Sequence, residues 1–117
     1  MKKKLVYICS PLHADSDEGI RKNMEKAKIY AEKVSKILNC RAVAPHAVLP
    51  DILDDNNPEE RKIGLRFGLD LLKLCSKVVV CGNTVSKGMR EEVRIADNFG
   101  IPVVTLEELI KNEGGKA

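Results

Sequence analysis

The sequence predicts an α/β domain in which helices cover both faces of a parallel sheet of four or five strands. Short runs rich in β-branched residues alternate along the chain with longer segments of helical periodicity, and parallel strands need such crossover connections. The short runs are apolar without alternation, which is typical of strands that are buried on both faces. They are Lys4–Cys9, Arg41–Ala44, Lys77–Cys81 and Ile101–Thr105.

A helix is expected after each of these strands. The first is marked by apolar residues that step by three and four along the sequence: Ile20, Met24, Ala27, Ala31, Val34 and Leu38. Asn57 opens the stretch NPEE, which combines an N-cap, a proline at the first helical position and a glutamate at the third. This stretch predicts a helix that runs to about Cys75. A third helix follows Ser86, and a capping box that begins at Thr105 opens the fourth.

Length and composition favour one globular domain. A chain of 117 residues is long enough for one core and too short for two, so we expect a single domain over residues 1–112 and a flexible tail over residues 113–117. The content of 44% hydrophobic and 32% charged residues is that of a folded protein rather than a disordered one. The net charge of +3 comes from cations scattered among acids, and the chain has only two Tyr, two Phe and no Trp. Nucleic acid is therefore not an expected partner.

We expect a cytoplasmic protein with reduced thiols and no membrane partner. No apolar run approaches the length of a membrane span, and the apolar part of the N-terminal stretch is too short for a signal peptide. The four cysteines form no C-x-x-C pair and have no matching pair of histidines, so buried free thiols are expected rather than a metal site or disulfides: Cys9, Cys40, Cys75 and Cys81.

The loops at the carboxyl ends of the strands are where a parallel sheet binds its ligands. They read SPLHADSD, PHAVLPDILDDNN and GNTVSKG. The last precedes a helix, whose N-terminus can hold a phosphate or carboxylate, but a plain turn capped by Ser86 explains it equally well. His13 and His46 are each an acid, a base or a ligand contact, or have no special role. Asp54 and Asp55 suggest a metal site, which an Asx-rich turn explains as well.

The adjacent glutamates of the third helix differ in position. At about 100° per residue, the apolar arc contains Met89, Val93, Ile95, Ala96 and Phe99, and Glu92 falls in its middle. A buried carboxylate must be paired, protonated or turned to a cavity. Glu92 is therefore either a functional residue or half of a buried ion pair, whereas Glu91 faces solvent.

Asp70 is a weaker candidate in the preceding helix. It lies at the edge of a charged stripe, where an ion pair with Arg66 or Lys73 accounts for it as well as a functional role does.

In their order these motifs resemble the nucleoside 2-deoxyribosyltransferase-like superfamily, which includes the 2'-deoxynucleoside 5'-phosphate N-hydrolases. The similarity is greatest to a branch of small bacterial and phage domains, and it covers roughly Val6 to Val104 through YICSP, APH, LDDNNPEER, GLDLLKLC and SKGMREE. The resemblance implies a flavodoxin-like (Rossmann-like) three-layer sandwich. It also implies that the protein forms homo-oligomers, because members of the superfamily build sites across subunits.

The resemblance implies roles for individual residues. Glu92, six residues after Ser86, matches the catalytic glutamate. Tyr7 matches the tyrosine that orients this glutamate, and Asp70 the aspartate that assists protonation of the leaving group. The matching substrate-binding positions are Ser10, Pro11, His46, Gly82, Asn83, Ser86 and Gly88.

Two departures from the superfamily concern charge. The N-hydrolases carry Gly-Ser-x-Arg after the first strand, where this chain has Ser10-Pro11-Leu12-His13. Arg21 or Lys87 would have to replace the missing phosphate-binding arginine. Lys77 stands just before the third strand, where the branch usually has an acidic residue.

The predicted function is cleavage or transfer at the N-glycosidic bond of a nucleoside or nucleotide. Glu92 would form a covalent glycosyl-glutamate that water or a second base resolves. No metal and no cofactor are expected. The alternative is a non-catalytic module that binds a nucleotide-like ligand as a sensor or a sequestering protein.

Overall fold

The computed structural model describes residues 4–54 and 56–113, and within them four parallel strands form one sheet in the order β2-β1-β3-β4. The predicted α/β fold with a parallel sheet is confirmed. Each strand is slightly shorter than its apolar run, because the first residues of the first and fourth runs and the last residues of the second and third runs lie outside the strands. The strands are β1 (Leu5–Cys9), β2 (Arg41–Val43), β3 (Lys77–Val80) and β4 (Val103–Thr105).

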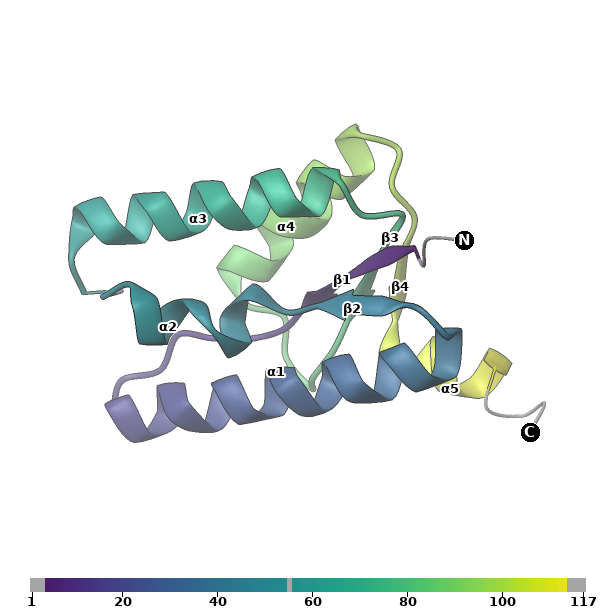
Figure 1. Cartoon of the computed structure of the whole chain (residues 1–117), viewed down its shortest axis with the longest axis horizontal. Helices are drawn as coiled ribbons and strands as arrows, with labels where there is room; N and C mark the ends of the chain where they lie inside the picture. Colours follow the sequence, from purple (N-terminus) through teal and green to yellow (C-terminus); the bar gives the residue numbers. More distant parts are fainter. Residues whose placement is uncertain (1–3, 55, 114–117) are drawn as a thin grey trace.

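Helices cover both faces of the sheet, as Figure 1 shows. On one face, α1 (Asp17–Leu38) and α5 (Leu106–Glu113) enclose a core with the side chains of Val6 and Ile8. On the other face, α3 (Pro58–Lys73) and α4 (Lys87–Asn98) enclose a second core. This is the predicted flavodoxin-like three-layer sandwich. The expected tail begins at Glu113, which is the last residue of α5, and its remaining residues lie outside the described part of the chain.

The predicted helix starts are confirmed by their caps. The Asn57 side chain accepts hydrogen bonds from the backbone N–H groups of Glu59 and Glu60 at the start of α3. At the start of α5, Thr105 Oγ1 accepts from the Glu108 N–H group while the Glu108 carboxylate accepts from the Thr105 N–H group, which is a capping box. Local polar chemistry thus fixes where these helices begin.

The segment after β2 is more structured than the expected loop. A 3₁₀ turn, η1 (Pro45–Ala47), is followed by the short helix α2 (Leu49–Ile52). Both lie beside α1 in Figure 1, and they carry His46 to the carboxyl edge of the sheet. Neither piece has a side-chain cap, so packing rather than local sequence stabilises them.

The four cysteines are buried, as predicted, and no disulfide joins them: Cys9, Cys40, Cys75 and Cys81. Burial raises the pKa of the Cys75 thiol to about 11 and that of Cys81 to about 12. Within residues 4–54 and 56–113, no helix has the length and apolar character to cross a membrane.

One predicted core position is wrong. Phe99 was expected on the buried arc of α4, but 58% of its surface is exposed. It is the C-cap residue, beyond the last helical turn that packs on the sheet, and Lys73 Nζ lies 5.1 Å from its ring centroid. A helical wheel therefore stops being informative where the helix ends.

Candidate active site

Tyr7 and Cys9 form one side of a buried cluster around Glu92. Alternation along β1 turns these two residues to the face covered by α3 and α4, while Val6 and Ile8 face the other core. The Tyr7 hydroxyl donates a hydrogen bond to Glu92 Oε2. The Cys9 thiol lies 3.5 Å from Glu92 Oε1. Each carboxylate oxygen of Glu92 thus has its own neutral donor.

Glu92 projects from α4 into this core, as the helical wheel predicts. It is 9% exposed, with Met89 before it and Ala96 after it on the same buried face. The alternative of a buried ion pair is not realised, because among the described residues no Lys, Arg or His lies within ion-pair distance of its carboxylate. The Glu92 carboxylate is thus buried against neutral donors, while the His46 ring acts on its charge from beyond ion-pair distance.

Burial dominates the ionisation of this cluster. Desolvation raises the pKa of Glu92 above its usual value, while His46 and the hydrogen bonds from Tyr7 and Cys9 partly offset the rise. Burial and the Glu92 charge also raise the pKa values of the Tyr7 hydroxyl and the Cys9 thiol. Both donors therefore keep their protons at neutral pH.

Ser10 and His46 meet at the end of β1. His46 Nδ1 lies 2.8 Å from the backbone oxygen of Ser10, which fixes the imidazole ring beside the cluster. The Ser10 side chain is 1% exposed, and its hydroxyl has no hydrogen-bond partner among the described residues. A buried hydroxyl without a partner is rare in folded proteins and suits a group that a ligand contacts.

Pro11 and Gly82 bring the loops after β1 and β3 together at the same edge. Gly82 has φ +102°, a conformation that favours glycine, and a Cβ there would lie 3.3 Å from Pro11 Cδ. The other predicted ligand contacts are exposed: Asn83, Ser86 and Gly88.

The Ser86 side chain serves the helix that follows. Its hydroxyl accepts the backbone N–H group of Met89 at 3.2 Å, so the capped turn foreseen as an alternative for this loop is present.

The sequence of residues 4–106 matches the family described as Domain of unknown function (DUF7768). The chain belongs to the DUF7768 family. No curated protein matches the chain at a significant level.

Among solved structures, the DUF7768 domain is similar to a 2-deoxyribosyltransferase from the psychrotolerant bacterium Bacillus psychrosaccharolyticus. The TM-score is 0.64 at 17% sequence identity, and the match covers 86% of this chain and 70% of that protein. The DUF7768 domain therefore has a nucleoside deoxyribosyltransferase-like fold.

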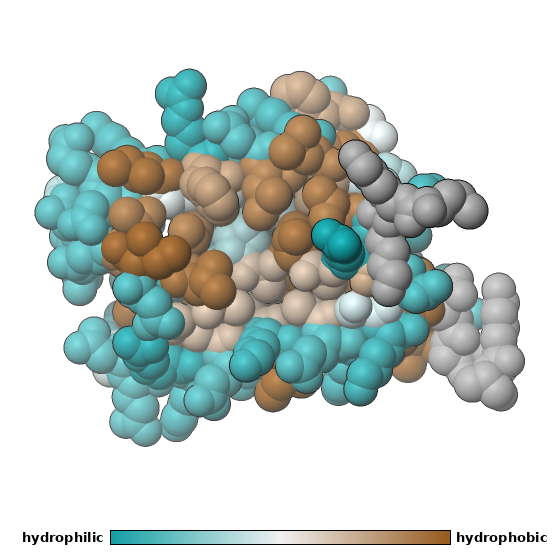
Figure 2. All heavy atoms as spheres, viewed as in Figure 1, coloured by the Kyte–Doolittle hydropathy of each residue, from teal (hydrophilic) through white to brown (hydrophobic). Residues whose placement is uncertain are grey.

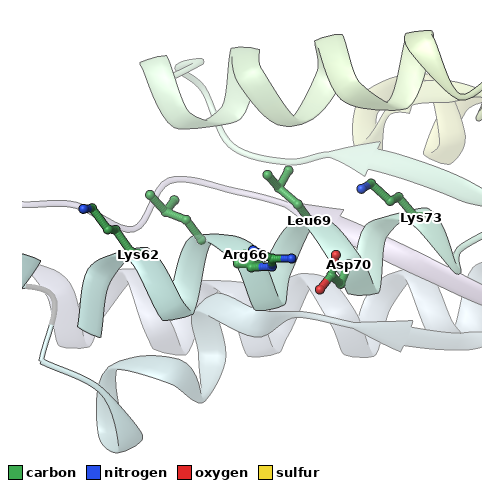
Figure 3. Close-up of a pocket in the computed structure, with 6 residues that line it drawn as sticks. Lys62, Arg66, Leu69, Asp70 and Lys73 are labelled. Carbon is green, nitrogen blue, oxygen red and sulfur yellow. The ribbon is translucent and has the colours of Figure 1, made fainter. Parts of the chain in front are cut away.

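Within the chain of this DUF7768 domain, Asp70 does not join the Glu92 cluster. A Cβ at Gly68 would lie 3.4 Å from the Tyr7 hydroxyl oxygen, so the Gly68 side of α3 faces the cluster. Asp70, two residues further, lies about 200° around the helix and is exposed. In Figure 3, Leu69 and Lys73 point toward α4 whereas Asp70 does not. Asp70 lines a surface hollow of about 380 Å³ and, among the described residues, forms no ion pair with Arg66 or Lys73.

Two of the remaining polar candidates have structural partners, and a third is exposed. Glu91 is exposed and pairs with Arg94, which lowers the pKa of the Glu91 carboxyl, as expected for a residue at the surface. Arg21, expected as a substitute phosphate ligand, pairs with Asp51 at 2.5 Å. Lys87 is exposed at the first turn of α4.

The Asp54 side chain closes an Asx turn with the N–H group of Asn56, and Asp55 lies outside the described residues. In the described part of the domain, no three His, Cys, Asp or Glu side chains are grouped as a metal site needs.

Sequence reasoning assigned Cys9 to the core and missed its contact with Glu92. The signal was present, because Cys9 is two residues after Tyr7 on one strand and must share its face. Once Tyr7 is placed against Glu92, the same alternation makes Cys9 the next candidate.

Proposed function

We propose that this DUF7768 domain cleaves or transfers at the N-glycosidic bond of a nucleoside or nucleotide, with Glu92 as the nucleophile. The observation that carries the proposal is the buried contact of Glu92 with Tyr7 and Cys9 at the carboxyl edge of the sheet. This edge is where parallel α/β sheets bind ligands. The similarity in fold to a 2-deoxyribosyltransferase supports the substrate class.

In this proposal the reaction has two steps. A Glu92 oxygen attacks the anomeric carbon, the glycosidic bond breaks, and the base leaves with the bonding electrons and takes up a proton. Water or a second base then attacks the glycosyl-glutamate and releases the Glu92 carboxylate. Tyr7 orients the nucleophile, while Ser10 and His46 contact the sugar or its substituents. Pro11, Gly82, Asn83, Ser86 and Gly88 border the bound substrate.

The proposed role of Asp70 as proton donor requires a second copy of the chain. Asp70 lies on one stripe of α3 with two exposed apolar side chains, Ile63 and Phe67, which are 58% and 52% exposed, and the C-cap residue Leu74, 72% exposed, follows the helix. Figure 2 shows that apolar side chains also gather over α2 and α3 on the face in view. We propose that this stripe is the homo-oligomer contact, because association buries the apolar surface and brings Asp70 next to another subunit.

The position of Asp70 favours one alternative, a non-catalytic module that binds a nucleotide-like ligand. A subunit without a leaving-group acid can hold a ligand at Ser10 and His46 without cleaving it. The carboxylate of Glu92 would then contact sugar hydroxyls.

Incubation of the pure protein with nucleosides, nucleotides and NAD-like dinucleotides, followed by chromatography for released base, tests the proposal. Glu92→Gln should abolish release, and the matched variant Glu91→Gln should retain it. Loss of activity in Glu91→Gln alone would contradict the assignment. No release of base from any substrate, together with a ligand-induced rise in melting temperature, would instead favour the binding module.

A further inference from the structure

The two oxygens of Glu92 are held by donors of different strength from the same strand. Oε2 accepts from the Tyr7 hydroxyl, and Oε1 lies 3.5 Å from Cys9 Sγ. Cys9 is completely buried, so its thiol is sheltered from water. This geometry leaves the Cys9 thiol in a position to fix one carboxylate oxygen.

We propose that Cys9 is a positioning residue, which donates its thiol proton to Glu92 Oε1 and, with Tyr7, fixes the carboxylate for attack. This proposal rests on the proposed function of Glu92. The structure thereby assigns a task to a cysteine that composition alone places in an inert core.

The thiol has one competing acceptor. The backbone oxygen of Met89 lies 3.7 Å from Cys9 Sγ, slightly farther than the Glu92 oxygen. Met89 is in the first turn of α4, so its carbonyl already accepts a helical N–H group. An ionised carboxylate is the stronger acceptor, so the thiol proton goes to Glu92 when Glu92 is charged.

The same surroundings make Cys9 a donor rather than a nucleophile. Burial and the neighbouring carboxylate raise the pKa of the Cys9 thiol, which therefore keeps its proton at neutral pH. Among the described residues, the titratable groups that act on Glu92 are Tyr7 and Cys9 from β1 and His46 from η1. The α3 face against the cluster contributes Gly68, which has no charge.

The experiment measures the ionisation of Glu92 directly. Glutamate labelled with ¹³C at the side-chain carboxyl is followed by NMR through a pH titration, and Glu92→Gln assigns its signal. The Glu92 midpoint in Cys9→Ala should move to higher pH. The acid dissociation constant of the Glu92 carboxyl should decrease about threefold to tenfold, because the ionised form loses a weak hydrogen-bond donor. Cys9→Ser restores a donor and should lie between wild type and Cys9→Ala.

Cys81→Ala is the matched control. Cys81 is also a completely buried thiol, but it belongs to the core on the other face of the sheet. An unchanged Glu92 midpoint in Cys9→Ala, or an equal shift in Cys81→Ala, would overturn the proposal. Should Cys9→Ala not fold, Cys9→Val takes its place, because valine also removes the donor and fills a similar volume. An unchanged Glu92 midpoint in Cys9→Val would overturn the proposal as well.

The titration does not depend on turnover. A Glu92 midpoint that moves as expected in a protein that releases no base would refute the proposed function and leave the Cys9 contact standing. Where base is released, the acid limb of the pH profile of kcat/KM should move together with the NMR midpoint.

Discussion

Removal of the Tyr7 hydroxyl tests how the protein keeps the buried carboxyl group of Glu92 in its ionised form. Tyr7→Phe preserves the ring that fills the core between β1 and α3, and it deletes only the donor to Glu92 Oε2. A hydrogen bond to a charged group contributes about 1.5–3 kcal/mol. Because 1.4 kcal/mol is a factor of ten, the ionised form of Glu92 should become about 10- to 100-fold less favourable.

The direction of the pH effect follows from the same contact. The hydroxyl stabilises the ionised form of Glu92, so its loss raises the pKa of this carboxyl further in the direction in which burial already shifts it. The acid limb of kcat/KM for base release should therefore move to higher pH. The difference in kcat/KM between Tyr7→Phe and wild type should be largest on the acid limb, and it should become smaller at a pH at which Glu92 is ionised in both proteins.

The chain offers a matched control for this variant. Tyr30 is the other tyrosine of the sequence and packs against the core on the opposite face of the sheet. Tyr30→Phe removes a hydroxyl that does not contact Glu92, so the acid limb of its pH profile should stay at the wild-type pH. A Tyr7→Phe profile with an unmoved acid limb would refute the reasoning.

Two further predictions concern stability and assembly. The pKa of Glu92 is raised in the folded state, so the wild-type protein loses stability as the pH rises through that value. Near pH 8, Glu92→Gln should therefore be more stable than wild type by on the order of 1 kcal/mol, and in acid it should not be. Urea unfolding measures this difference in the free energy of unfolding. A less stable Glu92→Gln near pH 8 would contradict this. Phe67→Glu should dissociate the proposed homo-oligomer in sedimentation experiments, whereas Ile110→Glu on α5, at a residue 46% exposed, should not. A wild-type monomer, or equal behaviour of both variants, would argue against the α3 stripe as the contact.

The fold could be predicted because its signals are local. Apolar β-branched runs gave the strands, and the caps at Asn57, Ser86 and Thr105 gave three helix starts, since a cap is satisfied within its own turn. The segment η1–α2 was not predicted. It is short and has no side-chain cap, so its structure depends on packing against α1 that the local sequence does not encode.

The candidate site was predictable only in part for the same reason. The apolar periodicity of one helix was enough to predict that Glu92 is buried, because a helical wheel relates residues that are close in sequence. The contact between Cys9 and Glu92 joins residues 83 apart, and no helical or strand period relates them. Asp70 is the opposite case. The resemblance implied a role for it beside Glu92, but its position on α3 turns it away from Tyr7.

Sequence alone left two explanations for a carboxylate on the apolar face of α4, a structural ion pair and a functional group. An ion pair would hold the charge with a cation, and its removal would destabilise the fold. The donors found at Glu92 are a hydroxyl and a thiol instead, and desolvation still raises the pKa of the carboxyl. Burial of Glu92 therefore lowers the stability of the fold, and residues that destabilise the fold in this way are common at functional sites. Glu92→Gln separates the two explanations, because a functional carboxylate predicts a variant that is more stable and inactive.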